Sequence, residues 1–145
     1  MPQSRTVVVL SFPGYQEVEF WYPVFRAREA GADLHLVTSD PEGCESHLGY
    51  PVVPTSTVEQ LAGLTIDALV VPGGVGAVPV ASAGQRALIG DFSVRHGHLV
   101  SSGTGTDLVR SLLGPGFTSP NWLTAPDADG MPELYRELFS RWSQK

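Results

Sequence analysis

The sequence predicts an α/β domain, a three-layer sandwich with a mostly parallel, flavodoxin-like central sheet. Three short apolar runs, at residues 6–10, 66–71 and 99–102, are typical of strands buried on both faces. Helix-like stretches separate these runs, and such alternation favours right-handed crossovers between parallel strands. The length of 145 residues suits a single domain over 1–145.

The first elements are a strand and a helix. Residues 6–10 are a continuous β-branched run, and residues 17–30 carry a broad apolar stripe at helical spacing that ends at Gly31. Pro23 falls inside the stripe, so the helix either kinks there or begins near Tyr22.

The next stretch is less apolar. Residues 33–38 alternate like a second strand, and 39–49 are polar and predict a loop. Prolines make 50–54 a candidate edge strand, because proline is excluded from a sheet interior. Thr57 is suited to cap a short helix that ends at Leu61.

The second half repeats the pattern of strand and helix. A third buried strand at 66–71 ends in Pro-Gly-Gly, and a helix-like stretch at 83–97 leads into the strand 99–102. A turn of small residues at 103–105 then opens a helix that continues to Leu113.

The C-terminal third is less regular. Glycine and proline at 114–116 break the helix, residues 117–126 predict a loop, and 131–142 predict a final amphipathic helix.

Composition excludes several classes of function. Nine Lys and Arg against fifteen Asp and Glu give a net charge of −6, which argues against nucleic acid or an anionic membrane surface as a partner. The chain has no apolar run near the ~20 residues that span a bilayer, and no signal-peptide pattern, so a cytoplasmic location is expected.

Cysteine and histidine usage predicts no metal site and no cofactor. Cys44 is the only cysteine, and the four histidines have no ligand spacing. Acidic residues near Cys44 argue against a catalytic thiolate there. His35 alternates within its strand and is interpreted as structural.

Ligands in parallel α/β sheets bind beyond the carboxyl ends of the strands. Three such ends are 11–14, 72–74 and 102–105. The last is a strand–turn–helix elbow, where an α/β enzyme holds its nucleophile at the apex. Here the apex is Gly103, which has no side chain.

In this order and spacing, the motifs resemble the ThiJ/PfpI branch of the class I glutamine-amidotransferase-like superfamily. The likeness covers about residues 5 to 122 and is closest to isocyanide hydratases and to the ligand domains of amidase-like regulators. The stretches that carry it are Val7–Val9, Phe12-Pro13-Gly14, Glu19 with Pro23, Ala30-Gly31, Asp67 to Gly74, Ser101 to Gly105, Leu112-Leu113 and Asn121-Trp122.

This sequence departs from the family pattern at two reactive positions. The elbow cysteine of the family falls on Gly103, and its downstream histidine falls on Asn121, just before Trp122. Relatives also continue into further strands, so the C-terminal part is expected to be shortened. The helix-turn-helix domain of the regulator relatives is expected to be absent.

Glu19 matches the acidic residue that lies beneath the nucleophile in the family. The resemblance implies that it donates or accepts a proton in the site. The alternative is a surface glutamate in the first turn of a helix, stabilised by the helix dipole.

The remaining candidates would bind substrate. Glycine N–H groups could stabilise negative charge, hydroxyl and amide groups could bind a ligand, and aromatic rings could form an apolar wall. Turn geometry, helix capping and loop packing are the corresponding structural alternatives. The candidates are Gly73, Gly74, Gly103, Thr104, Asn121, Trp122 and Tyr22.

Because the thiol-dependent activities of the family need a nucleophile, the sequence favours a small-molecule enzyme with non-covalent acid–base chemistry, of the lyase, hydratase, isomerase or cyclase type. The first alternative is a non-catalytic module that binds or senses a small molecule, and the second is a structural subunit. A homodimer is expected, because relatives commonly dimerise and a terminal helix would expose Phe139 and Trp142.

Overall fold

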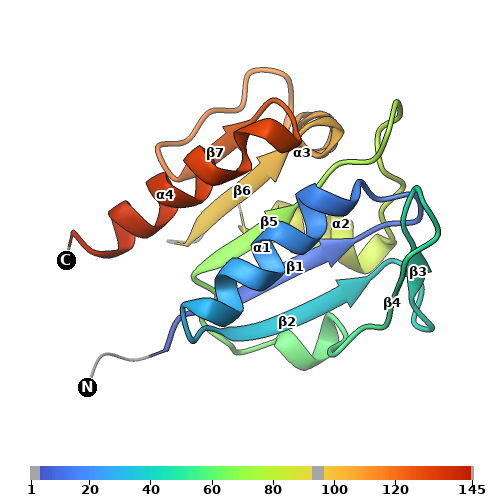
Figure 1. The fold of residues 1–145 in the computed structure, drawn as a ribbon, viewed down its shortest axis with the longest axis horizontal. Helices are drawn as coiled ribbons and strands as arrows, with labels where there is room; N and C mark the ends of the chain where they lie inside the picture. The colour runs from blue at the N-terminus through green and yellow to red at the C-terminus, as the bar shows by residue number, and fades with distance from the viewer. Residues whose placement is uncertain (1–3, 93–96, 145) are drawn as a thin grey trace.

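Five parallel strands form the central sheet of the protein, whose computed structural model describes residues 4–92 and 97–144 (Figure 1). The strands lie in the order β2-β1-β5-β6-β7. Every neighbouring pair is parallel. Their bounds are β1 Thr6–Ser11, β2 Asp33–Thr38, β5 Ala68–Val71, β6 His98–Ser102 and β7 Trp122–Ala125.

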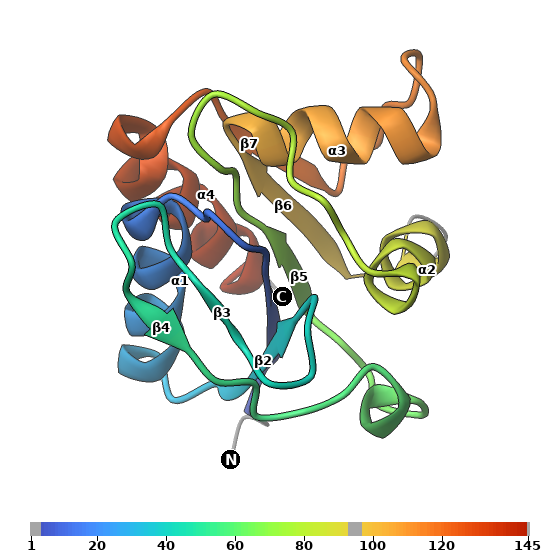
Figure 2. The ribbon, with the colours of Figure 1, turned by 90° about the vertical axis from the view of Figure 1, so that its right-hand side faces the viewer.

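Helices cover both faces of this sheet. Figure 2 shows α1 (Glu17–Glu29) and α4 (Met131–Trp142) on one side, and α2 (Ala83–Phe92) and α3 (Thr104–Leu113) on the other. The buried side chains form two clusters, one under each helix pair. The predicted three-layer α/β sandwich with a parallel flavodoxin-like sheet is therefore confirmed.

The apolar runs form strands because alternate side chains of a strand point to opposite faces. In β1, Val7 and Val9 pack under α1 and α4, whereas Val8 and Leu10 pack under α2 and α3. All four side chains are at most 4% exposed, so the run must be apolar at every position.

Helix α1 passes through its proline without ending. It begins at Glu17, where the side chain of Gln16 accepts a hydrogen bond from the N–H of Glu19 (2.8 Å). Pro23 is buried inside the helix. The alternative that the helix begins near Tyr22 is therefore wrong.

The side chain of Gln85 links α2 to the sheet by hydrogen bonds. Its side chain is completely buried, and its Nε2 donates to the backbone carbonyls of Ser11 and Val37, both at 3.0 Å. Its Oε1 accepts the N–H of Ser82 (3.0 Å). One amide thus bonds the ends of β1 and β2 and the residue that precedes α2.

The structure differs from the sequence predictions in its short elements. A hairpin of β3 (Cys44–Glu45) and β4 (Pro51–Val52) begins inside the predicted 39–49 loop. Strand β7 lies inside the predicted 117–126 loop, because pairing with β6 stabilises a four-residue strand that its own residues signal only weakly.

The remaining points concern two short helical turns and the end of the predicted 83–97 helix. The short helix predicted to end at Leu61 is a 3-10 turn, Glu59–Leu61, and a second 3-10 turn, Ala128–Gly130, precedes α4. Residues 93–96 of the predicted 83–97 helix lie outside the described residues. Among the helices that the structure describes, none has the length and apolar character to cross a membrane.

Candidate functional site

The strand order reverses between β1 and β5, and ligands of parallel α/β folds bind at such a switch point, beyond the carboxyl ends of the strands. Glu19, in the first turn of α1, extends its carboxyl group into this place and is 4% exposed. Its Oε1 accepts the N–H of Gly73 (3.0 Å) and the hydroxyl of Ser102 (2.7 Å). The carboxyl therefore connects the ends of β5 and β6 to α1.

The two carboxyl oxygens of Glu19 have different surroundings. Oε1 has two donors, whereas Oε2 receives no hydrogen bond from any residue that the structure describes. A proton on this carboxyl would be carried by Oε2, because Oε1 already accepts two hydrogen bonds.

Gly103 is the apex of the turn between β6 and α3. Its backbone has φ +50° and ψ −132°, a conformation that favours glycine. A Cβ atom at this position would lie 2.9 Å from both carboxyl oxygens of Glu19. Glu19 thus lies directly beneath the apex and occupies the space where an apex side chain would begin.

The N–H groups of the three candidate glycines all have acceptors within the protein. Gly73 donates to Glu19, Gly74 donates to Oγ1 of Thr104 (2.8 Å), and Gly103 donates to the carbonyl of Ala125 (3.0 Å). A ligand could accept hydrogen bonds from these N–H groups only if it displaced their present acceptors. The N–H groups of Thr104 and Gly105, in the first turn of α3, have no acceptor among the described residues.

The structure does not bring Asn121 and Trp122 to the apex, which corrects their predicted place. The carbonyl of Asn121 accepts the N–H of Leu99, at the opposite end of the sheet. Trp122 donates from Nε1 to Ser101 Oγ (3.0 Å) and packs on Phe117.

The residue of β7 beside Gly103 is Ala125. An irregular loop separates the turn at 103–105 from Asn121, so the spacing of the motif alone does not locate this residue in the fold. The alternation of 122–125 before Pro126 is the signal that would have placed the strand.

Tyr22 also lies apart from the apex contacts. Its ring packs on Tyr135 of α4, with centroids 5.7 Å apart. It lines a groove on the outer face of α1 together with Trp21 and Phe25.

Ser102 and Gln16 also contact Glu19, and neither is among the residues that the sequence predicts for the site. Ser102 donates to the carboxyl of Glu19, and Gln16 caps the helix turn that carries it. Their signals were a hydroxyl immediately before the elbow and a polar residue at the start of an apolar stripe.

We expect Glu19→Ala to lower the free energy of unfolding by about 2 kcal/mol, because the N–H of Gly73 and the hydroxyl of Ser102 lose their acceptor. Glu19→Gln keeps an acceptor oxygen and should cost about 1 kcal/mol or less. Urea unfolding of both variants tests this expectation, and equal losses would contradict it.

Cys44 lies in β3, with its Sγ 3.2 Å from the hydroxyl of Ser11. Burial raises the pKa of this thiol, and the charge of Asp40 raises it further, while the bond to Ser11 opposes both. Iodoacetamide should therefore modify native Cys44 more slowly at pH 8 than it modifies the chain unfolded in urea. Equal rates, followed by mass spectrometry, would contradict the predicted protection.

A parallel α/β sandwich with a strand–turn–helix elbow is an architecture in which enzymes carry their active site at the elbow. The chain belongs to the DJ-1/PfpI family, whose sequence profile matches residues 5–112. A protein of Archaeoglobus fulgidus, described as uncharacterized, is 32% identical over 68 residues, which are 47% of this chain. The match spans only 40% of that relative's length.

Solved structures of the family have the same fold. DJ-1beta of Drosophila melanogaster has a TM-score of 0.84 at 16% identity, over 99% of this chain and 92% of its own. Oxidized DJ-1 of Toxoplasma gondii has a TM-score of 0.79 at 16% identity, over 94% and 90%. A structure named putative protease I, from Bacteroides thetaiotaomicron, has 0.77 at 16% identity, over 95% and 99%. At these identities the likeness concerns the fold alone.

Proposed function

We propose that this protein is a small-molecule enzyme that uses non-covalent acid–base chemistry, with Glu19 as the group that gives or takes the proton. A lyase, hydratase, isomerase or cyclase reaction fits this role. The observation that carries the proposal is the position of the Glu19 carboxyl beneath Gly103, with Oε1 held by two donors and Oε2 without a described hydrogen bond. A fixed carboxyl with one unbonded oxygen suits proton transfer.

The proposal excludes a thiol nucleophile at the apex, since Gly103 occupies that position. Cys44 is a weak substitute, because burial raises the pKa of its thiol and the thiol contacts Ser11. Negative charge on a substrate would instead meet the N–H groups of Thr104 and Gly105 at the start of α3. Within the family, we propose that this chain is of the isocyanide-hydratase-like subtype, with Gly103 at the position of the nucleophile.

The test begins with a metabolite screen by thermal shift, followed by mass spectrometry of each hit after incubation. Glu19→Gln should lower turnover of an identified substrate by about 10²–10⁴-fold, because the amide cannot exchange the proton. Glu17→Gln is the matched control, since Glu17 lies in the same helical turn but bonds the N–H of Leu48. Unchanged turnover in Glu19→Gln would contradict the mechanism.

The second candidate is a module that binds or senses a small molecule without converting it. This alternative is favoured by the engaged N–H groups of Gly73, Gly74 and Gly103 and by the 4% exposure of Glu19. A ligand that stabilises the protein and is recovered unchanged after long incubation would support it. Binding at 100 times Kd should add roughly 2.7 kcal/mol of stability.

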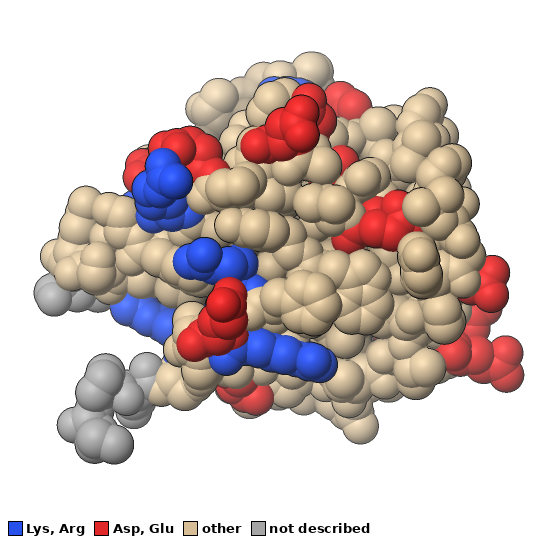
Figure 3. Space-filling model, viewed as in Figure 1, with Lys and Arg blue, Asp and Glu red and all other residues tan. Residues whose placement is uncertain are grey.

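We also propose a homodimer through the outer face of α1. Family relatives are often dimeric. The face combines the exposed apolar residues Val18 and Phe25 of α1 with Tyr50 beside β4, and it encloses a groove of about 560 Å³. Figure 3 shows that uncharged side chains occupy much of the side that carries α1 and α4.

Phe139 and Trp142, which the sequence analysis expects to be exposed on the last helix, are less available for such an interface. Phe139 and Trp142 pack against the core and are only partly exposed. Arg26 lies over the ring of Phe139 (4.9 Å) and Arg5 over that of Trp142 (5.2 Å), so both aromatic residues are already covered.

Phe25→Glu should convert the dimer to a monomer, because a charge at the centre of an isologous apolar contact meets its own copy. Val80→Glu is the control, since Val80 is 79% exposed and lies outside this face. Light scattering after gel filtration measures both variants. A wild-type chain that is monomeric at high concentration would contradict the proposed dimer.

A further inference from the structure

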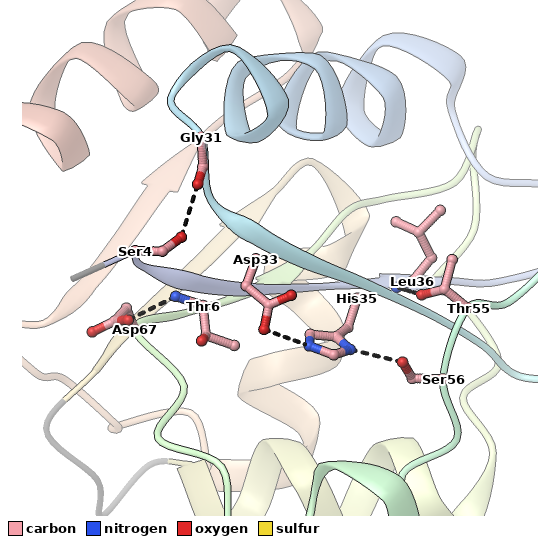
Figure 4. A network of polar contacts seen from close by, with 9 residues as sticks. All are labelled: Ser4, Thr6, Gly31, Asp33, His35, Leu36, Thr55, Ser56 and Asp67. Carbon is pink, nitrogen blue, oxygen red and sulfur yellow. Dashed lines mark hydrogen bonds and ion pairs between the residues drawn. The ribbon is translucent and has the colours of Figure 1, made fainter.

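Three side chains away from Glu19 are hydrogen-bonded in series (Figure 4). The hydroxyl of Ser56 lies 2.7 Å from Nδ1 of His35. Nε2 of the same ring lies 3.2 Å from Oδ2 of Asp33. A hydroxyl, an imidazole and a carboxylate joined in this order are the parts of an activated nucleophile, its base and the group that orients the base.

The backbone fixes these three groups in place. Asp33 and His35 are alternate residues of β2, so their side chains share one face of the strand. Thr55 exchanges two hydrogen bonds with Leu36, from its N–H to the carbonyl (2.9 Å) and from the N–H of Leu36 to its Oγ1 (2.8 Å). The segment that carries Ser56 is therefore held along the outer edge of β2.

The hydroxyl of Ser56 needs an acceptor if it is to lose its proton. When Nε2 of His35 carries the ring proton and donates it to Asp33, Nδ1 has a free lone pair toward Ser56. Asp33 is the only carboxylate that the structure bonds to this ring, among the described residues, and it favours that tautomer. The His35 side chain is 19% exposed, so the base is largely shielded from water.

Ser56 also faces free space. It lines a hollow of about 360 Å³, which we call the Ser56 hollow, between the end of β2, the 54–60 segment and the start of α2. Val37 and Val58 give it apolar walls, and Ser39 and Glu59 are among its polar ones. The described residues that line it include no Lys or Arg, so it does not suit an anionic ligand.

We propose that Ser56 is the nucleophile of a second site, which hydrolyses small uncharged carboxylic esters, with His35 as the base and Asp33 as the residue that orients it. The Ser56 oxygen forms a bond to the acyl carbon while its proton passes to Nδ1 of His35. The bond from the acyl carbon to the alcohol oxygen then breaks, and the departing alcohol takes that proton. Water, deprotonated in turn by His35, cleaves the acyl–Ser56 ester, and the proton returns to the Ser56 oxygen.

An alkyl fluorophosphonate tests the nucleophile without knowledge of the natural ester, because its phosphorus bonds to an activated serine with loss of fluoride. Intact mass and peptide mapping should find one adduct, on Ser56. Ser56→Ala should abolish it, and His35→Gln should slow it by about 100-fold or more. Ser140→Ala is the control, since this exposed serine of α4 does not line the hollow, and the variant should be labelled like the wild type.

Circular dichroism of each variant establishes that loss of labelling is not loss of fold. Hydrolysis of p-nitrophenyl acetate should fall in the same order across the variants. A folded wild-type chain without an adduct, an adduct on another residue, or equal labelling of His35→Gln would each overturn the proposal. These outcomes do not depend on Glu19, so the acid–base proposal stands or falls separately.

Discussion

Replacing Gln85 by glutamate is expected to lower the free energy of unfolding by about 3–5 kcal/mol at neutral pH. The Nε2 group of Gln85 donates to the carbonyls of Ser11 and Val37, both at 3.0 Å. A carboxylate of the same shape loses both donors and faces two carbonyl oxygens in a fully buried place. Urea unfolding at pH 7 measures the loss.

Two further variants isolate the charge. Gln85→Met removes the donors without adding a charge and should cost about 2 kcal/mol. Gln60→Glu is the matched control on the surface. Because Gln60 is exposed, this substitution should change the free energy of unfolding by less than about 0.5 kcal/mol. The penalty of Gln85→Glu should shrink in acid, where a protonated carboxyl is uncharged and keeps one donor. A loss no larger than that of Gln60→Glu would contradict the role of Gln85.

Gly105→Ala is expected to destabilise the protein by about 3 kcal/mol, or roughly 10 °C in Tm. A Cβ atom on Gly105 would lie 2.7 Å from the carbonyl oxygen of Pro72 and closer still to that of Val71. Both are backbone atoms at the end of β5, so neither can rotate out of the contact as a side chain could. Helix α3 would have to move away from the sheet, and the elbow at Gly103 would move with it.

Gly90→Ala provides the matched control inside a helix. Gly90 lies in α2, and a Cβ atom there would meet nothing within 4 Å. The substitution should stabilise the protein by roughly 0.5–1 kcal/mol, because alanine has the higher helix propensity. Calorimetry of the two variants should therefore give shifts of opposite sign. Similar shifts would refute the close contact of α3 with β5.

The fold could be predicted because its main strands are buried on both faces. Residues such as Val7, Val8 and Val9 leave no polar side to the strand, and this pattern is local to the sequence. Strand β7 is different. Its Thr124 is exposed and it has only four residues, so it depends on pairing with β6, which a single stretch of sequence does not reveal.

The candidate site, like the fold, has parts that the sequence predicts and parts that it does not. The closeness of Glu19 and Gly103 could be expected from the family resemblance, because the acidic residue of the family lies beneath its elbow and these two residues fall on those positions. The place of Asn121 could not, because an irregular loop separates it from the nearest motif. The alternation of residues 33–38 places His35 on one face of its strand but gives no sign of its contact with Ser56, which is 21 residues away.

The crowding between residues 19 and 103 limits the side chain that the apex can carry. Any mutation that adds a side chain at the apex begins with a collision, since the carboxyl below is tied to Gly73 and Ser102. A reactive side chain could return there only if the Glu19 carboxyl moved aside. The side-chain conformation of Glu19 and the size of residue 103 are therefore coupled.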